Sequence, residues 1–195
     1  MLILKTVLTT KTAKIPKLGY IQYMNNNNNN FSLINHNSFG IEANAEKFVS
    51  ISTVQELKKI IISNRNEEKI FIGGGSNILI TRNIKGLVIN LNMKGISSKK
   101  IDDNHTEVKI NSGENWNDCV KWCLKNNLGG IENLSLIPGN TGAAPIQNIG
   151  AYGVELKDVF ISCSVLDINT NKILEFKNEE CQFEYRNSIF KQNKN

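Results

Sequence analysis

The chain has 195 residues, of which 40% are hydrophobic and 21% charged, a composition that suits one globular domain or two small ones and excludes a disordered or fibrous chain. No apolar run approaches the roughly 20 residues of a membrane-spanning helix, so the sequence excludes an integral membrane protein. Outside residues 1–24, which hold four lysines and no acid, 19 basic residues face 18 acidic ones, so the net charge of +5 lies almost wholly in that segment. We therefore expect neither a nucleic-acid nor a membrane partner.

Residues 1–30 are predicted to form a disordered basic tail, because they lack helical or strand periodicity and end in six consecutive asparagines. Met24 opens this polar run, so the true start is either Met1 or Met24, and a basic targeting segment is the alternative interpretation. The apolar residues 1–4 are too few for the core of a signal peptide. We expect that removing residues 1–23 leaves folding intact.

Residues 31–97 are predicted to form a first subdomain with a small sheet and one helix. The helix runs from a cap at Ser52 or Thr53, closed by Gln55 or Glu56, to about Asn64. Its position among short apolar runs indicates a β-α-β-β order. The predicted strands are residues 47–51, 69–72, 78–80 and 86–91.

Polar residues around 97–103 indicate a boundary, and residues 98–195 are predicted to form a second subdomain. Its helix should end at Gly129-Gly130 and turn Val120 and Cys123 inward. A long segment, residues 131–155, is rich in glycine and predicted as a loop. The predicted helix is residues 116–126 and the predicted strands are residues 106–111, 159–166 and 172–176.

The cysteines and histidines give no metal-binding pattern. Cys119 and Cys123 lie one helical turn apart, which suits packing on one helix face, and neither His36 nor His105 is near them in sequence. We therefore predict reduced thiols in a cytoplasmic protein and no metal site. Both histidines stand among polar residues and are predicted to be solvent-exposed. The four cysteines are Cys119, Cys123, Cys163 and Cys181.

The run Gly73-Gly74-Gly75-Ser76-Asn77 follows a predicted strand and is the first candidate binding loop. Glycines let the main chain approach a ligand closely and turn its N–H groups inward, which suits phosphate. No Gly-Lys-Ser/Thr follows, and Ile78 stands where a dinucleotide fingerprint has its third glycine. A plain tight turn remains the alternative.

Residues 136–153 form the second candidate loop. Its small residues cannot build much core, but they suit irregular main chain pressed against a flat ligand. A loop this long inside a compact domain is usually functional, and an ordinary surface loop is the alternative. A separate signal comes from arginine, which occurs only three times against 20 lysines. Arg65, Arg82 and Arg186 are therefore candidates for a two-point contact with an anion that lysine cannot supply.

Together with residues 37–40, these two loops and the pattern Phe183-x-Tyr-Arg-x-Ser-x-Phe190 resemble the UDP-N-acetylenolpyruvoylglucosamine reductase (MurB) family over residues 32–191. The resemblance implies an α+β fold with two small subdomains of the vanillyl-alcohol-oxidase, or PCMH-type, FAD-binding class. It also implies a non-covalent FAD. Trp116 and Trp122 could stack on such a ring, but core packing is favoured.

The resemblance implies an oxidoreductase that uses FAD and NADPH to reduce the enolpyruvyl group of a UDP-sugar to UDP-N-acetylmuramate, for peptidoglycan and hence cell shape and division. It implies a catalytic role for Arg186, whose guanidinium suits the substrate carboxylate, and a substrate-binding role for Tyr185. The residues that it places at FAD are Gly73, Gly74, Gly75, Ser76, Asn77, Ile137, Pro138, Gly139, Gly142, Ala143, Ala144, Pro145, Ile149 and Gly153.

The family's substrate domain, with its serine proton donor and assisting glutamate, has no counterpart in these 195 residues. We therefore expect this chain to supply the FAD-binding part, to be completed by a longer reading frame or a separate C-terminal polypeptide, and to be inactive alone. The alternatives are a catalytically inactive flavin-binding remnant and another flavin oxidoreductase of the same fold class.

Overall fold

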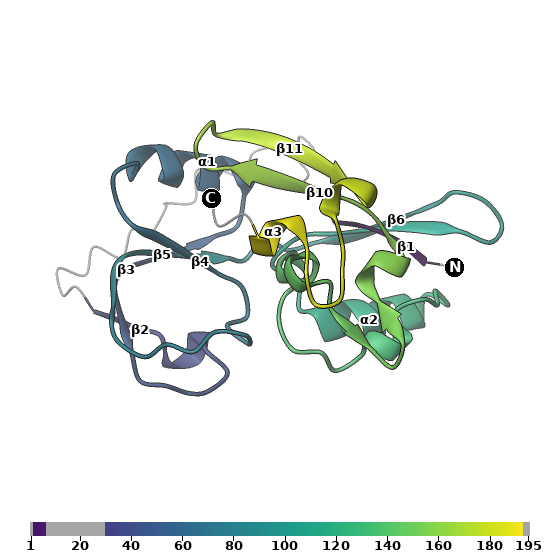
Figure 1. The fold of residues 1–195 in the computed structure, drawn as a ribbon, viewed down its shortest axis with the longest axis horizontal. Helices are drawn as coiled ribbons and strands as arrows, with labels where there is room; N and C mark the ends of the chain where they lie inside the picture. Colours follow the sequence, from purple (N-terminus) through teal and green to yellow (C-terminus); the bar gives the residue numbers. More distant parts are fainter. Residues whose placement is uncertain (1, 7–29, 193–195) are drawn as a thin grey trace. The chain divides into compact units, whose positions relative to one another are not determined.

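The computed structural model describes residues 2–6 and 30–192, and the chain divides into two units between Leu91 and Asn92. The α1 unit comprises residues 30–91, and the α2 unit comprises residues 2–6 and 92–192 (Figure 1). The sequence placed this boundary after residue 97. The difference arises because a polar edge strand, β6 (Ile96–Lys100), pairs with the strand that follows it and so belongs to the α2 unit.

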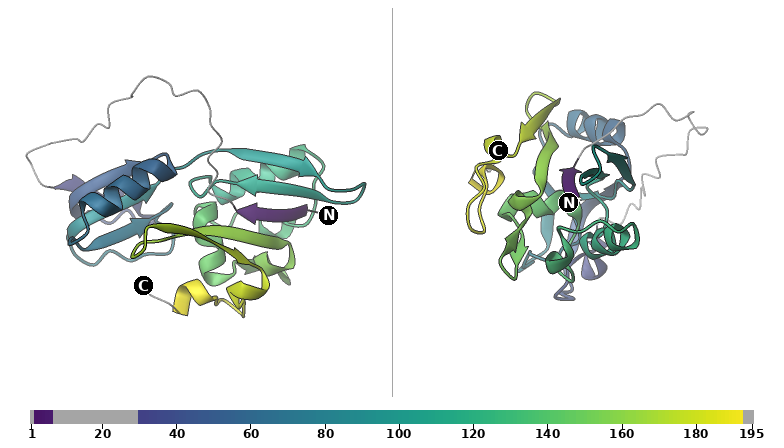
Figure 2. Two further views of the ribbon diagram at one scale, coloured as in Figure 1. Left: turned by 90° about the horizontal axis from the view of Figure 1, so that it is seen from above. Right: turned by 90° about the vertical axis from the view of Figure 1, so that its right-hand side faces the viewer.

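The α1 unit is a four-stranded sheet in the order β2-β3-β5-β4 with one helix against it (Figure 2). The central strands β3, β5 and β4 run parallel, and β2 pairs antiparallel with β3. Its small core contains the buried side chains of Leu33, Ile72 and Val88. The strands are β2 (Phe31–Ser32), β3 (Asn44–Ile51), β4 (Lys69–Ile72) and β5 (Ile84–Leu91).

Helix α1 (Val54–Ser63) begins at the predicted capping box, which the structure confirms. The Thr53 hydroxyl accepts from the Glu56 N–H at 3.1 Å, and a Glu56 carboxylate oxygen accepts from the Thr53 N–H at 3.1 Å. These bonds satisfy donors that a helix start leaves open. The helix buries the face with i, i+3 and i+4 spacing toward the sheet, namely Val54, Leu57, Ile60 and Ile61.

The predicted strand at residues 78–80 is wrong, because this segment has no regular structure. Ile80 is buried and Ile78 packs against the same core as Val88. Its apolar residues therefore reflect burial of an irregular segment, which a short apolar run cannot distinguish from a strand.

The α2 unit contains a five-stranded sheet in the order β11-β10-β1-β7-β6. Strand β1 lies between β7 and β10 and runs parallel to both, as Figure 2 shows. The predicted tail is therefore wrong at residues 2–6, while residues 7–29 lie outside the described residues. A five-residue strand is too short to show periodicity. The strands not yet given are β1 (Leu2–Thr6), β7 (Thr106–Ile110), β10 (Phe160–Asp167) and β11 (Lys172–Lys177).

Helix α2 (Trp116–Lys125) covers this sheet and supplies much of its core. Trp116 is 1% exposed, and its indole N–H donates to the Leu134 carbonyl at 2.8 Å, so the favoured core role is confirmed. All four cysteines are buried free thiols. The shorter elements are η1 (Ile34–His36), η2 (Glu132–Leu134), η3 (Thr141–Gln147), η4 (Leu156–Asp158), η5 (Glu179–Cys181), β8 (Gly150–Ala151), β9 (Val154–Glu155) and α3 (Ile189–Gln192).

The histidines differ from their predicted exposure, since both are half-buried. The His36 ring packs against Phe31 and Phe48, with ring centroids 5.5 and 4.7 Å away. His105 Nδ1 lies 2.9 Å from a carboxylate oxygen of Asp102. The polar residues beside each histidine in the sequence indicated exposure, whereas the contacts that bury the rings come from neighbouring strands and a tight turn.

Candidate functional site

The loop Gly73–Asn77 follows β4 in the α1 unit and packs against the turn at residues 36–38. Gly75 has φ +63°, and a Cβ there would lie 1.9 Å from the His36 carbonyl oxygen. The Gly75 carbonyl accepts from the Ser38 N–H at 3.0 Å. Gly75 is therefore required by this internal contact, which differs from the ligand approach that the motif suggested. Gly74 and Asn77 are the exposed members of the loop.

Asn37 holds the opposing turn and was missed as a site-supporting residue by the sequence analysis. Its side chain is buried, donates to the carbonyls of Leu33 at 2.8 Å and Ile41 at 3.0 Å, and accepts from the Ile41 N–H at 2.9 Å. The tendency of asparagine to bond nearby main chain in turns is the local signal that could have identified it.

The second loop lies in the α2 unit and exposes only part of the predicted set. Pro138, Ala143 and Gly153 are exposed, and Ile137, Gly139 and Gly142 are half-buried. The remaining three side chains are buried, so any ligand contact there falls to the main chain. These three are Ala144, Pro145 and Ile149.

Arg186 stands in an unusual main-chain conformation, with φ +54°. Its Nη2 donates to the Gly150 carbonyl at 2.6 Å, and its guanidinium carbon lies 5.8 Å from the centroid of the exposed Tyr185 ring. Arg186 is itself exposed. The guanidinium carries five N–H donors in a planar fork, so one bond to Gly150 leaves donors for an anionic ligand.

Asn148 connects the loop to the turn that carries Arg186 and was also missed. It is fully buried with φ +44°, a region that asparagine tolerates better than most residues. Its amide donates to the Glu184 carbonyl at 3.1 Å, and its side-chain oxygen accepts from the Lys157 N–H at 3.0 Å. Because Glu184 lies two residues before Arg186, Asn148 fixes the start of that turn.

A carboxylate sits on the same hairpin as the Gly150 carbonyl. Glu155 pairs with Gly150 across β8 and β9. The Lys157 ammonium, 2.6 Å from the Glu155 carboxylate, holds the pKa of Glu155 below its usual value. Arg186 contributes a smaller effect of the same sign. Arg186 therefore stands near a carboxylate that stays ionised, and the two opposite charges balance.

Left-handed main chain gathers in these segments. Four non-glycine residues with positive φ belong to the two predicted motifs of the α2 unit, and three others lie elsewhere among the described residues. Such conformations persist where the surroundings enforce them, often at functional sites. The four are Leu136, Asn148, Tyr152 and Arg186.

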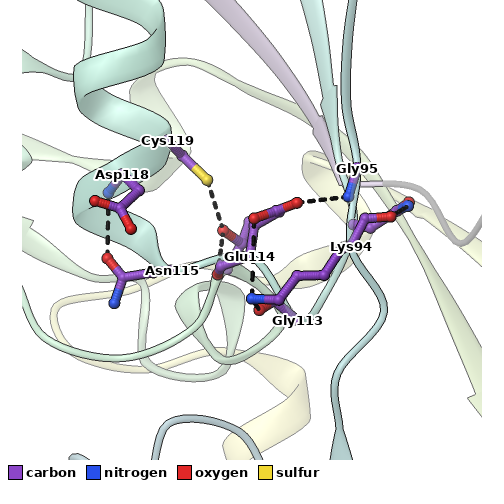
Figure 3. A network of polar contacts seen from close by, with 9 residues as sticks. Lys94, Gly95, Gly113, Glu114, Asn115, Asp118 and Cys119 are labelled. Atoms are coloured by element: carbon purple, nitrogen blue, oxygen red, sulfur yellow. Dashed lines mark hydrogen bonds and ion pairs between the residues drawn. The ribbon is translucent and has the colours of Figure 1, made fainter. Parts of the chain in front are cut away.

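Residues 112–116 form what we call the clasp, which bonds to the second loop at Gly139–Gly142. Figure 3 shows Gly113 and Glu114 of the clasp beside Lys94 and Gly95. The Gly142 N–H donates to the Ser112 carbonyl at 2.9 Å, and the Trp116 N–H donates to the Gly139 carbonyl at 2.9 Å. The Thr141 N–H donates to the Glu114 carbonyl at 2.8 Å. From the sequence, only Trp116 of this segment could be singled out, because main-chain bonds leave little side-chain pattern.

Each of the two loops, taken by itself, suits a polar ligand that approaches its main chain. Each exposes glycine-rich main chain, and open space surrounds the position of a Cβ at Gly153, where φ is +78°. The buried Ser112 hydroxyl has no hydrogen-bond partner among the described residues. Buried polar groups are normally paired, so this orphan beside Gly142 fits a polar ligand group. In residues 2–6 and 30–192, no cluster of metal-ligating side chains and no helix able to cross a membrane occurs.

Comparisons with known proteins show the family to which the chain belongs. Residues 45–177 match the family model for the FAD binding domain. A UDP-N-acetylenolpyruvoylglucosamine reductase from Flavobacterium johnsoniae is 52% identical over 162 residues, 83% of this chain and 48% of that protein. The reductase from Amoebophilus asiaticus is 46% identical over 165 residues, again 48% of its length. The chain thus spans about half the length of the curated relatives it matches.

A solved structure shows the same fold. The UDP-N-acetylenolpyruvylglucosamine reductase (MurB) from Thermus caldophilus superposes with a TM-score of 0.65 at 22% identity, over 82% of this chain and 55% of that one. The predicted α+β fold class and the predicted family resemblance are confirmed. The chain belongs to the FAD binding domain family, among relatives that are UDP-N-acetylenolpyruvoylglucosamine reductases.

Proposed function

We propose that this chain binds FAD non-covalently and supplies the FAD-binding part of a reductase that converts UDP-N-acetylenolpyruvoylglucosamine to UDP-N-acetylmuramate in peptidoglycan synthesis. The observation that carries the proposal is the FAD-binding family match over residues 45–177, which includes both glycine loops, combined with 52% identity to a named reductase. Because the chain spans about half of those relatives, substrate turnover is proposed for the whole reductase.

In this proposal, FAD held by these residues would supply hydride transfer from NADPH to the enolpyruvyl double bond of the sugar nucleotide. Residues 73–77 donate main-chain N–H groups to the pyrophosphate, and residues 137–145 line the ring system. Arg186 binds the substrate carboxylate through its planar fork and stabilises the charge that develops beside it. The exposed ring of Tyr185 shapes the same region.

A cytoplasmic location is part of the proposal. The four cysteines are buried free thiols, and no disulfide occurs among them. Proteins that keep all their thiols reduced are typical of reducing compartments. The substrate is then met where nucleotide sugars and NADPH are both available.

Titration of the purified chain with FAD tests the proposal. We expect saturable binding of one FAD, which quenching of the flavin fluorescence measures. Denaturation of the chain should release the flavin. Gly74→Asp should weaken binding by about tenfold, since it adds a negative charge on the exposed loop beside the phosphates. Asn66→Asp adds the same charge at an exposed position outside the loop and should have no effect.

The same titration separates the cofactor role from the substrate role. Arg186→Lys should bind FAD as the natural chain does, because Arg186 is assigned to the substrate carboxylate. A chain that does not bind FAD, or equal weakening by Gly74→Asp and Asn66→Asp, contradicts the proposal. Loss of FAD binding in Arg186→Lys would instead assign Arg186 to binding of the cofactor.

A further inference from the structure

We infer that Glu114 is a positioning residue that fixes the second loop in the shape that binds FAD, an inference that rests on the proposed function. Glu114 lies in the clasp, where its side chain faces Lys94 and Gly95 (Figure 3) and its carbonyl bonds to Thr141 of the loop Gly139–Gly142. Its side chain bonds one neighbour and its main chain bonds the other.

The side chain of Glu114 fixes the first neighbour. One carboxylate oxygen accepts from the Gly95 N–H at 2.5 Å, and the other lies 3.9 Å from the Lys94 ammonium. The same ammonium donates to the Gly113 carbonyl. The Glu114 side chain is only 19% exposed, and its bonds to Gly95 and Lys94 set the position of residues 113–114.

The carbonyl of Glu114 fixes the second neighbour. It accepts two bonds from Thr141, from the N–H at 2.8 Å and from the hydroxyl at 3.2 Å. Thr141 is 1% exposed, and its hydroxyl also lies 3.4 Å from the Cys119 sulfur. The N–H and the hydroxyl of Thr141 are therefore both paired, and the position of Thr141 depends on the position of the Glu114 carbonyl.

The three segments are packed without space between them. A Cβ at Gly113 would lie 2.5 Å from the Asn92 carbonyl carbon, and a Cβ at Gly142 would lie 2.6 Å from the Ser112 Cβ. Close-packed layers transmit a displacement instead of absorbing it. A shift of Glu114 therefore passes to Gly139–Gly142, which is the main chain that faces the proposed ring system.

A preformed loop binds more tightly because it does not lose freedom when the ligand arrives. Removing the Glu114 carboxylate should free Gly95 and Lys94 and loosen the loop. Glutamine keeps an oxygen that accepts from Gly95, so it should keep most of the order. The effect should appear in FAD affinity and in the visible spectrum of bound flavin, which reports the surroundings of its ring.

The experiment measures FAD affinity, bound-flavin spectrum and thermal unfolding for the full chain and three variants. Glu114→Ala should weaken FAD binding by about tenfold and shift the flavin bands, while Glu114→Gln should stay within about threefold of the natural chain. Asp118→Ala is the matched control, because Asp118 is a nearby exposed acid whose carboxylate lies 3.5 Å from the Lys121 ammonium. It should leave affinity and spectrum unchanged.

If Glu114→Ala does not fold, Thr141→Val and Thr141→Ser decide the question. Valine removes the hydroxyl, and with it the bond to the Glu114 carbonyl and the contact with the Cys119 sulfur, and should weaken binding, whereas serine keeps the hydroxyl and should not. Natural affinity and spectrum in Glu114→Ala or in Thr141→Val overturn the inference while the proposed function stands. A natural chain that binds no FAD overturns both.

Discussion

The two units build their sheets from different parts of the chain. In the α1 unit all four strands come from one continuous segment, β2 to β5. In the α2 unit, β1 comes from the start of the chain and lies between two strands that begin more than 100 residues later. The first unit is therefore assembled from local contacts, and the second depends on a pairing of long sequence separation, which costs more chain entropy to form.

The largest effect should come from breaking β1. Leu4→Pro removes a main-chain N–H and fixes φ in a strand paired on both sides. We expect a loss of more than about 3 kcal/mol from the α2 unit, with the α1 unit still folded. Hydrogen exchange of the two units, followed separately, measures this.

Leu4→Ala is the matched control, because it shortens the same side chain and keeps the N–H. Equal destabilisation by alanine and proline would contradict a role for the strand pairing itself. Removal of residues 1–23 should reproduce the proline effect, which reverses the expectation from the sequence that this segment is dispensable.

A glycine pair in the α1 unit should give a smaller effect confined to that unit. Gly75 and Gly40 have nearly equal φ values, +63° and +62°, but only Gly75 faces main-chain atoms at clashing distance. Gly40→Ala should cost about 1–2 kcal/mol for the left-handed conformation alone. Gly75→Ala adds overpacking against His36 and should cost about 2–5 kcal/mol.

Thermal unfolding of both variants measures the difference. Equal melting temperatures for Gly75→Ala and Gly40→Ala would show that the contact with His36 does not constrain the loop. Unchanged hydrogen exchange in the α2 unit is expected for both variants.

Acidification should have the smallest effect on stability, and the two units should lose stability at different pH values. Burial lowers the pKa of His36 from 6.5. The contribution of neutral His36 to the stability of the α1 unit is therefore present above pH 6.5 and is lost as the pH falls below that value. In the α2 unit, the His105 bond lowers the pKa of Asp102, and the Lys157 bond lowers that of Glu155, from 3.8 and 4.5 respectively. These contributions are present above those values and are lost only at lower pH.

Between pH 7 and pH 5 the α1 unit should therefore lose stability while the α2 unit does not. Unit-resolved hydrogen exchange against pH checks this. His36→Phe, which keeps a ring beside Phe31 and Phe48, should abolish the change in the α1 unit. Parallel loss in both units over this range would contradict the assignment.

The sequence predicted what local pattern determines. The α1 capping box, the α2 face and the β10–β11 hairpin each have a periodic or turn signal within a few residues. It could not predict β1, whose partners are distant, or the irregular residues 78–80, whose burial resembles that of a strand. The family resemblance places Ala144 and Ile149 at the cofactor, which stays a prediction for their main chain, because their side chains complete the core of the α2 unit. The clasp escaped prediction because its bonds come mainly from main-chain atoms.

The most direct test of the account is hydrogen exchange of the full chain with and without one equivalent of FAD. The account predicts that saturating FAD protects amides in both glycine loops, residues 73–77 in the α1 unit and residues 137–145 in the α2 unit, and that amides of β11 stay unchanged. Binding without protection of either loop, or no binding at all, would contradict the claim that these loops form the FAD site.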